Sequence, residues 1–414
     1  MPRFSLVVPT LRRADTLEHT LATLCAQPES ELEIVVQNNG NDPATRQLVD
    51  RLQDPHLRHF HTDEVVSMVE NWERGLSNST GDFVTFVGDD DGLLPDACHV
   101  AGSILADSDA ELLSWAPFLY LWPGYWDEPR RNVLQATVSY QFTIKGVASR
   151  PLLERFYDFE AHYSQLPMVY NSFVKRSLID RVRDRHGKYF FGSLPDVTSG
   201  IVNAAFCESF LWSNRPLSVA GLSHHSTGNR MTRAETRLSQ EDWLRDFPEM
   251  PERDFDAGSN LEFLIAGEMA LVAEQVLREP EFVKLNEQGL VKAMAAAIND
   301  SPSRYDETKM AILGLMERFD LTSDEVTIPA RQAQATAPAK GVHVLDPYTV
   351  LFAMDGNRLG LRSIADAVQL ASQIVPGADG IFRAGNVEEA PSPSTAVARI
   401  RRAIKRRAWL RAIW

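Results

Sequence analysis

Cysteine is scarce in this chain. Of its 414 residues only three are cysteines, Cys25, Cys98 and Cys207, and they lie far apart in the sequence. An odd number of isolated cysteines suits reduced thiols better than a disulfide framework or a zinc site built from cysteine ligands. Because reduced thiols are typical of intracellular proteins, we expect the protein to be cytoplasmic.

Long apolar runs are also missing. The longest stretch without a charged residue, 112–126, has 15 residues and contains Pro117, Pro123 and Gly124. A membrane-spanning helix needs about 18 or more predominantly apolar residues. The apolar run at 4–9 is too short for the core of a secretory signal. We therefore expect neither a transmembrane helix nor a secretory leader.

Positive charge is in deficit. The chain has 42 Lys and Arg residues against 56 Asp and Glu residues, which gives a net charge of -14. Nucleic-acid binding depends mainly on basic side chains at the phosphates, so this balance argues against nucleic acid as a partner. The chain is 44% hydrophobic, and its length suits two or three domains, each with a buried core.

The first 115 residues contain a regular alternation of strand and helix signals. Apolar segments predict strands, and apolar residues at helical spacing predict helices between them. Asp42 and Pro43 suit the N-cap and the first position of one such helix. The expected strands are 4–9, 33–37, 57–61 and 83–87. This order predicts an α/β fold with a mostly parallel central sheet and helices on both faces.

The remaining sequence divides by composition. The alternation continues less regularly to about residue 230, so we place a first domain at 1–235. We expect a mainly helical region at 240–328, a linker with a small mixed segment at 329–395, and a basic amphipathic tail helix at 396–414. The predicted fold class is therefore α/β with a mainly helical C-terminal region.

Polar residues follow the predicted strands at their carboxyl ends, where parallel sheets bind ligands. The most distinctive group is the triplet Asp89, Asp90 and Asp91. Adjacent carboxylates raise one another's pKa unless a cation lies between them. Mg²⁺ and Mn²⁺ prefer oxygen ligands, and Mg²⁺ commonly joins carboxylates to phosphates. The triplet predicts a metal-bridged nucleotide diphosphate site, and a solvated acidic turn is the alternative.

Four segments of the first domain stand in a distinctive order and spacing: 7–13 (VVPTLRR), 33–40 (EIVVQNNG), 70–76 (ENWERGL) and 81–91 (GDFVTFVGDDD). Taken together, they resemble the GT-A fold of the family 2 glycosyltransferases, which is Rossmann-like. The resemblance covers about the first 230 residues.

The resemblance implies an inverting transferase that uses a nucleotide-diphosphate sugar, with a UDP-sugar favoured, and Mn²⁺ or Mg²⁺ as cofactor. The acceptor would be a glycan or a lipid-linked intermediate, as in polysaccharide biosynthesis of the cell envelope. Asp91 would hold the metal, and Asp89 and Asp90 would face the ribose and the sugar. The other implied nucleotide-sugar residues are Pro9, Thr10, Leu11, Arg13, Asn38 and Asn71.

Two positions depart from the family pattern. Asn38 stands where the family usually has an Asp that accepts a hydrogen bond from uracil N3–H, and Gly88 stands where an Asp often opens the acidic motif. An amide oxygen can accept the same hydrogen bond, so uridine remains a possible nucleoside of the donor. The sequence does not decide which base the donor carries.

The resemblance also assigns a general base. Asp196, at the predicted start of a helix, matches the place of the family's catalytic carboxylate, which would take the proton of the acceptor hydroxyl. The alternative is that Asp196 is only an N-cap, a common role for Asp.

Two further groups have weaker assignments. His225, of the pair His224–His225, is predicted to complete the metal shell, with Arg230 and Arg233 as diphosphate partners; an ordinary loop pair is the alternative. In the aromatic segment 115–126, we assign Trp122, Tyr125 and Trp126 to an acceptor wall, because aromatic rings stack on sugar faces. Core packing explains that segment nearly as well.

The last 16 residues are unlike the rest, because they contain seven Arg or Lys residues and no acid. Residues 1–398 then carry 35 basic against 56 acidic residues, a charge of -21. We expect the tail to bind an anionic membrane surface, which would place the protein on the inner face of the membrane. The alternatives are a solvated helix, an RNA-binding tail, and an arm that docks on a neighbouring subunit of a homo-oligomer.

Two other functions stay open. A sugar-1-phosphate nucleotidyltransferase also pairs a parallel sheet with acidic metal ligands, but the chain lacks a Gly-rich, basic loop after the first predicted strand. A catalytically inactive sugar-binding or nucleotide-binding module would account for the departures at Asn38 and Gly88.

Overall fold

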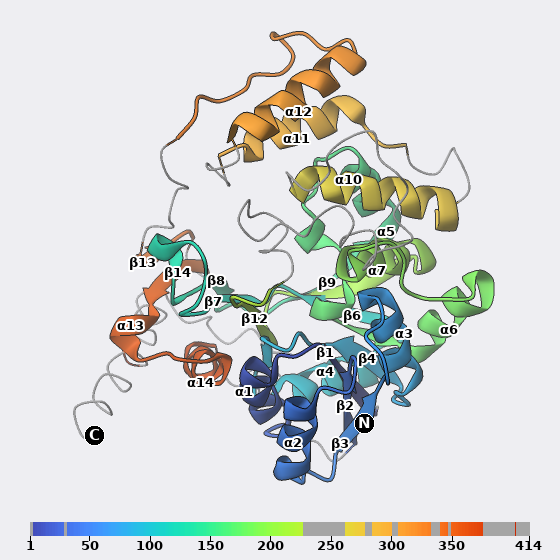
Figure 1. The fold of residues 1–414 in the computed structure, drawn as a ribbon, viewed down its shortest axis with the longest axis vertical. Coiled ribbons are helices and arrows are strands. Elements are labelled where there is room, and N and C mark those ends of the chain that lie inside the picture. Colours follow the sequence, from blue (N-terminus) through green and yellow to red (C-terminus); the bar gives the residue numbers. More distant parts are fainter. Residues whose placement is uncertain are drawn as a thin grey trace.

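Two β-sheets organise the computed structural model of the protein (Figure 1). The structure describes residues 3–28, 31–226, 261–277, 284–299, 305–332, 340–346 and 349–375, together with Arg402. Within these ranges no helix is both long enough and apolar enough to cross a membrane.

The first sheet has eight strands in the order β3-β2-β1-β4-β10-β6-β11-β9. Its pairs β3–β2, β2–β1, β1–β4 and β6–β11 are parallel, and β10 runs antiparallel to both of its neighbours. The strands are β1 (Phe4–Thr10), β2 (Leu32–Asn38), β3 (Leu57–His61), β4 (Phe83–Phe86), β6 (Leu112–Trp115), β9 (Ile144–Ala148), β10 (Ser172–Lys175) and β11 (Ser209–Ser213). The α/β fold with a mostly parallel sheet is confirmed.

Helices cover both faces of this sheet, which is why β1 and β2 are buried along their whole length. Leu6 and Val8 pack on one face with α1 and α4, while Val7 packs on the other with α3, α6 and α7. The helices are α1 (Ala14–Leu24), α2 (Pro43–Leu52), α3 (Met68–Ser77), α4 (Ala97–Ala106), α5 (Ser149–Tyr157), α6 (Arg176–His186) and α7 (Pro195–Phe206). The predicted start of α2 is confirmed, because Asp42 is its N-cap and accepts a hydrogen bond from Thr45 N at 2.9 Å.

The second sheet joins segments that are far apart in the sequence. Its order is β13-β14-β8-β7-β12-β5, and β14 pairs antiparallel with all of β8. Helix α14 (Ile364–Ile374) shares the apolar core of this sheet and contacts α1. The strands are β5 (Gly92–Leu93), β7 (Phe118–Leu121), β8 (Val133–Ser139), β12 (Ser218–Leu222), β13 (Gly341–Val344) and β14 (Thr349–Asp355). The segment 341–375 therefore completes a sheet begun by residues 92–222.

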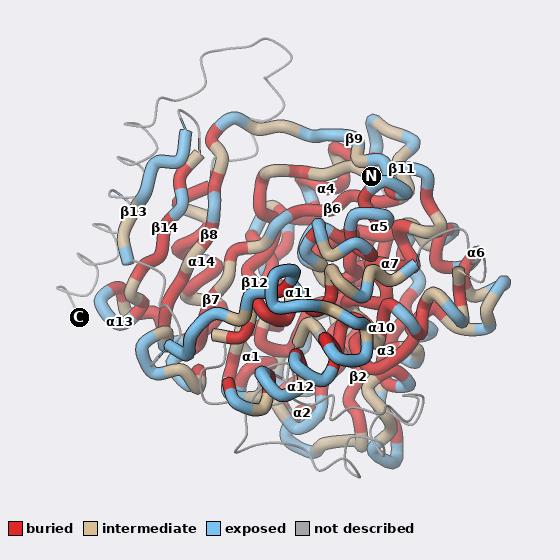
Figure 2. The backbone as a smooth tube through the Cα atoms, turned by 90° about the horizontal axis from the view of Figure 1, so that it is seen from above, coloured by how far each residue is buried: buried red, intermediate tan, exposed pale blue. Residues whose placement is uncertain are grey.

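Helices from the region 261–318 lie above the first sheet in Figure 1. Helix α10 (Leu261–Val272) packs on α7 and continues into a π-helical turn (Ala273–Leu277), while α11 (Glu287–Ala297) and α12 (Tyr305–Arg318) pack on each other. Figure 2 shows burial concentrated in the sheet strands and α7, with exposed residues along α12 and β13. Short elements complete the chain: α13 (Gly356–Leu359) and the 3-10 turns Glu128–Arg130, Tyr163–Gln165 and Val169–Asn171.

Phe352 and Leu351 on β14 test the role of the C-terminal segment. The side chain of Phe352 is fully buried, with its ring 5.8 Å from that of Phe118, whereas Leu351 is 40% exposed. We expect Phe352→Ala to lower the free energy of unfolding by about 3–5 kcal/mol. The matched control Leu351→Ala should change it by less than about 1 kcal/mol. Urea unfolding followed by circular dichroism measures both, and equal losses would contradict this account of the second sheet.

Candidate active site

The candidate site lies where β1 and β4 end, beside the end of β12, and the turn Val169–Asn171 contacts both β4 and α7. Asp89, Asp90 and Asp91 follow β4 directly, and each carboxylate has a different set of partners.

Asp89 is held by the loop that follows β1. Its carboxylate accepts a hydrogen bond from Thr10 Oγ1 at 2.7 Å and pairs with Arg13 Nη1 at 3.0 Å. Burial raises the pKa of Asp89 although Arg13 opposes the rise. Burial lowers the pKa of Arg13, but the charges of Asp89 and Asp90, with the hydrogen bond to Asp89, together raise it above its ordinary value. The sequence predicts that Thr10 and Arg13 belong to this site, and in the structure both bind the carboxylate of Asp89.

Asp90 is held by the turn that follows β12. Its Oδ2 accepts hydrogen bonds from Ser223 Oγ and Ser226 Oγ, both at 2.6 Å, and from Ser223 N at 3.2 Å. Its backbone carbonyl accepts a hydrogen bond from Trp122 Nε1 at 3.1 Å. These donors join the acidic motif to the second sheet, and the charge of Arg13 also acts on Asp90.

Asp91 is held by two backbone N–H groups, from Gly221 at 2.6 Å and from Gly88 at 3.0 Å. Burial, with the charges of Asp90 and Asp89, raises the pKa of Asp91 to about 8. A Cβ on Gly88 would lie 2.6 Å from Asp91 Oδ2, so a larger residue there would displace this carboxylate. The departure at Gly88 therefore has a local structural reason.

Asp196 lies in the first turn of α7 and is not its N-cap, because the N-cap position is Leu194. Burial raises the pKa of the Asp196 carboxyl, and hydrogen bonds from backbone N–H groups oppose the rise. Tyr170 is electrostatically linked both to Asp196 and to the triplet. The pKa of Tyr170 is raised well above its ordinary value, first by burial and then by the charges of Asp91, Asp196, Asp89 and Asp90.

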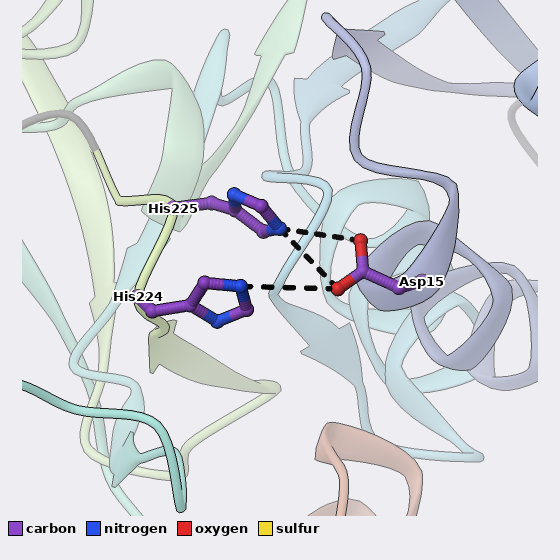
Figure 3. Close-up of side chains that lie close together, drawn as sticks. All are labelled: Asp15, His224 and His225. Atoms are coloured by element: carbon purple, nitrogen blue, oxygen red, sulfur yellow. Dashed lines mark hydrogen bonds and ion pairs between the residues drawn. The ribbon is translucent and has the colours of Figure 1, made fainter.

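His225 lies against Asp15 on α1, as Figure 3 shows. Its Nε2 is 3.3 Å from the carboxylate of Asp15, and His224 Nε2 is 4.0 Å from it. Ligand atoms of the three residues lie within 4.8 Å of one another, and Asp91 is not part of this group. The pKa of His224 is lowered, first by burial and then by His225. Asp15 is thus a candidate metal ligand that the sequence prediction had missed.

Asn38 and Asn71 have different environments. The amide of Asn38 closes its own turn, since its oxygen accepts from Asp42 N and its nitrogen donates to Asp42 O, both at 3.0 Å. Asn71 is 3% exposed, and its nitrogen donates to the Gln37 carbonyl at 3.4 Å. Among the residues that the structure describes, the buried oxygen of Asn71 has no hydrogen-bond partner.

The predicted acceptor wall needs a correction. Trp122 and Tyr125 are 7% and 4% exposed, because they pack in the cores of the second sheet. Their faces are covered by protein, so they do not offer the open rings expected from the sequence. Trp126 is partly buried and stays a prediction.

Of the other residues predicted for the site, some are described by the structure and some lie outside the described residues. Pro9 is the next-to-last residue of β1 and is buried, whereas Leu11 follows the strand and is 38% exposed. Arg230, Arg233 and all of the basic tail except Arg402 lie outside the described residues.

Comparisons with known proteins assign the first part of the chain to a family. The model of "Glycosyl transferase family 2" matches residues 5–176. This segment belongs to glycosyl transferase family 2.

Two curated relatives match shorter parts of the chain. A Campylobacter jejuni protein named GalNAc(5)-diNAcBac-PP-undecaprenol beta-1,3-glucosyltransferase is 31% identical over 127 residues, 27% of this chain and 41% of its own length. Glycosyltransferase AglD of Haloferax volcanii is 32% identical over 93 residues, 21% of this chain and 15% of its own length. The chain therefore spans less than half of either relative.

Solved structures of low sequence identity also match. S. aureus TarS 1-349 in complex with UDP-GlcNAc is 15% identical with a TM-score of 0.41, over 74% of this chain and 83% of that one. Mannosyltransferase PcManGT from Pyrobaculum calidifontis, in complex with GDP-Man and Mn2+, is 17% identical with a TM-score of 0.41, over 77% and 75%.

Gly221 tests the contact between β12 and the acidic motif. A Cβ at Gly221 would lie 1.9 Å from the Asp90 carbonyl oxygen, whereas a Cβ at Gly146 on β9 would meet nothing within 4 Å. We expect Gly221→Ala to lower the free energy of unfolding by about 1–3 kcal/mol, because it overpacks the site. Gly146→Ala is the matched control and should stay within about 0.5 kcal/mol of the unchanged protein. Chemical unfolding of both variants decides, and a tolerated Gly221→Ala would contradict this geometry.

Proposed function

We propose that the protein is a metal-assisted inverting glycosyltransferase that moves a sugar from a nucleotide-diphosphate sugar, UDP-sugar favoured, to a glycan or lipid-linked acceptor. One observation carries the proposal. In the family 2 segment, three buried carboxylates follow β4, and Asp196 lies close enough that its charge acts on the same buried Tyr170 as the charges of the triplet. Such a site would bind the diphosphate of the donor at the triplet and would keep Asp196 available as a general base.

Asn71 supports a nucleoside pocket at the end of β2. A buried acceptor without a partner costs about 1–3 kcal/mol, so a bound donor group at its oxygen would be favourable. Asn38, in contrast, uses its amide within its own turn. We propose that Asn71 takes over the recognition of a base N–H that the family pattern gives to position 38.

The donor set of the triplet fits a divalent cation such as Mn²⁺ or Mg²⁺. Burial and mutual repulsion raise the pKa of Asp91 to about 8, so its carboxylate lacks sufficient countercharge. Asp91 would hold the ion. Asp15, His224 and His225 form a separate group, which does not include Asp91, and their carboxylate and imidazole donors also suit Mn²⁺. When bound, such an ion neutralises the negative charge of the departing nucleoside diphosphate.

The chemistry then needs one base. Asp196 accepts the proton of the acceptor hydroxyl as that oxygen bonds to the anomeric carbon of the sugar. The bond from this carbon to the diphosphate oxygen breaks on the opposite side, so the configuration inverts and the nucleoside diphosphate leaves. The burial that raises the pKa of Asp196 also makes its carboxylate a stronger base.

The name of the Campylobacter relative supports a lipid-linked acceptor, because it contains a PP-undecaprenol group. Binding of the tail to an anionic membrane would bring the site to such an acceptor. The tail lies outside the described residues, apart from Arg402, so this part of the proposal depends on its composition.

Asp196→Asn tests the role of the base. Because an amide cannot accept the proton, we expect transfer to fall by about 10²–10⁴-fold. Binding of UDP with Mn²⁺, measured by isothermal titration calorimetry, should not change. Asp184→Asn on the exposed side of α6 is the control for loss of one acidic charge. If Asp196→Asn turned over the donor as fast as the unchanged protein, the assignment of the base would be wrong. If the unchanged protein bound the donor without any turnover, the protein would instead be an inactive binding module.

The pH dependence of the rate gives a separate test. Only ionised Asp196 accepts a proton, so the rate should fall about tenfold per pH unit below its pKa. Because burial raises that pKa, the midpoint should lie above the ordinary value of 3.8. The profile of kcat/KM measures it, with residual activity of Asp196→Asn as control. The same acidic limb in Asp196→Asn would show that another group is responsible.

A further inference from the structure

A buried carboxylate from α10 reaches the loop in front of Asp196. Glu268 has no exposed surface. Its Oε1 accepts hydrogen bonds from Ser193 Oγ at 2.5 Å and Ser193 N at 3.1 Å, and its Oε2 lies 3.2 Å from the same N. Burial of a carboxylate is unfavourable unless such hydrogen bonds compensate for lost water.

Gly192 shows how closely the loop approaches this carboxylate. Its φ of +63° lies in the left-handed region, and a Cβ there would lie 1.7 Å from Glu268 Oε2. Glycine alone combines this backbone conformation with this close approach. Gly192, Ser193 and Glu268 therefore form one matched contact between α10 and the loop.

The same loop leads directly into the helix that carries Asp196. Leu194 is the N-cap of α7, and Thr198 Oγ1 donates to the Phe191 carbonyl at 2.8 Å, which binds the loop to the first turn. Leu264 and Met269 of α10 share an apolar core with residues of α7. The contact at Glu268 is therefore joined to the start of α7 by a hydrogen bond and by a shared apolar core.

We propose that Glu268 is a positioning residue for Asp196. It holds Ser193 so that the first turn of α7 presents the Asp196 carboxylate to the acceptor hydroxyl, an inference that rests on the function proposed above. The helical region would then be part of the catalytic unit, although it lies beyond the family 2 segment in the sequence.

Glu268→Gln and Ser193→Ala test this role. Glutamine keeps the shape of Glu268 but loses its charge, and its amide nitrogen, a donor, takes the place of one of the two oxygens that face Ser193 N. We expect kcat to fall by about 10- to 100-fold in Glu268→Gln, as misplaced catalytic groups do, and by less in Ser193→Ala, which keeps the backbone donor. KM for the donor should stay within twofold. Glu274→Gln, at an exposed position of the adjoining π-helical turn, is the matched control and should match the unchanged protein.

A double variant separates positioning from general loosening. If the two residues act through one contact, the variant with both substitutions should lose no more kcat than Glu268→Gln alone. Circular dichroism and unfolding curves show which variants are folded, and Ser193→Ala keeps the test available if Glu268→Gln does not fold. Values of kcat within twofold of the unchanged protein in both folded variants, additive losses, or a parallel rise of donor KM would overturn the proposal. Failure of the unchanged protein to turn over any donor would instead defeat the proposed function.

Discussion

The burial of three consecutive carboxylates at the end of β4 is the constraint on which the rest of the site depends. Like charges so close together are unfavourable in a low-dielectric place, and each needs its own compensation. Asp89 receives a guanidinium and a hydroxyl from the loop after β1. Asp90 receives two serine hydroxyls and a backbone N–H from the turn after β12. Asp91 receives only backbone N–H groups, so it is the carboxylate best placed to gain from an added cation.

This constraint explains why the second sheet is needed. Gly221 lies in β12, and the turn that carries Ser223 and Ser226 follows this strand. Strand β12 is held in place by its pairing with β5 and β7. β7 pairs with β8, and β8 pairs with β14 from the C-terminal segment. The acidic motif and residues near 350 are therefore joined by one continuous ladder of backbone hydrogen bonds. The helical region has a comparable relation to Asp196 through Glu268 and the core shared by α7 and α10.

Much of the fold could be predicted from the sequence, because the relevant signals are local. Apolar runs indicate the strands β1, β2 and β4, and Asp42 and Pro43 mark the start of α2. Thr10, Arg13 and the triplet could be placed together because carboxyl ends of parallel strands meet at one edge of a sheet. The site residues Ser223, Ser226, Tyr170 and Asp15 had no such signal. Their positions depend on strand register, or on elements that meet only in the folded chain.

Two expectations show where local reasoning fails. Trp122 and Tyr125 stand beside Pro123 and Gly124, which favours a loop, yet the sheet that buries them includes strands from 341–355. Asn38 stands where the family pattern has a base-recognising Asp, and only the folded turn shows that its amide also hydrogen-bonds with the backbone of Asp42, while its role at a base stays a prediction. The residue type alone predicts neither the burial of the aromatic rings nor the hydrogen bonds of Asn38. Burial depends on segments that are distant in the sequence, and these hydrogen bonds depend on the geometry of the turn.

By itself, the sequence determined the α/β alternation, the family resemblance and the clustering of acids at a strand end, since these depend on residue type, periodicity and order along the chain. Tertiary structure alone decided which groups compensate each acid, which aromatic rings are covered, and how α10 reaches the loop before Asp196. The physical reason is that hydrogen bonds and burial join residues that are brought together only when distant segments pack: Asp90 with Ser223, Phe118 with Phe352, and Ser193 with Glu268.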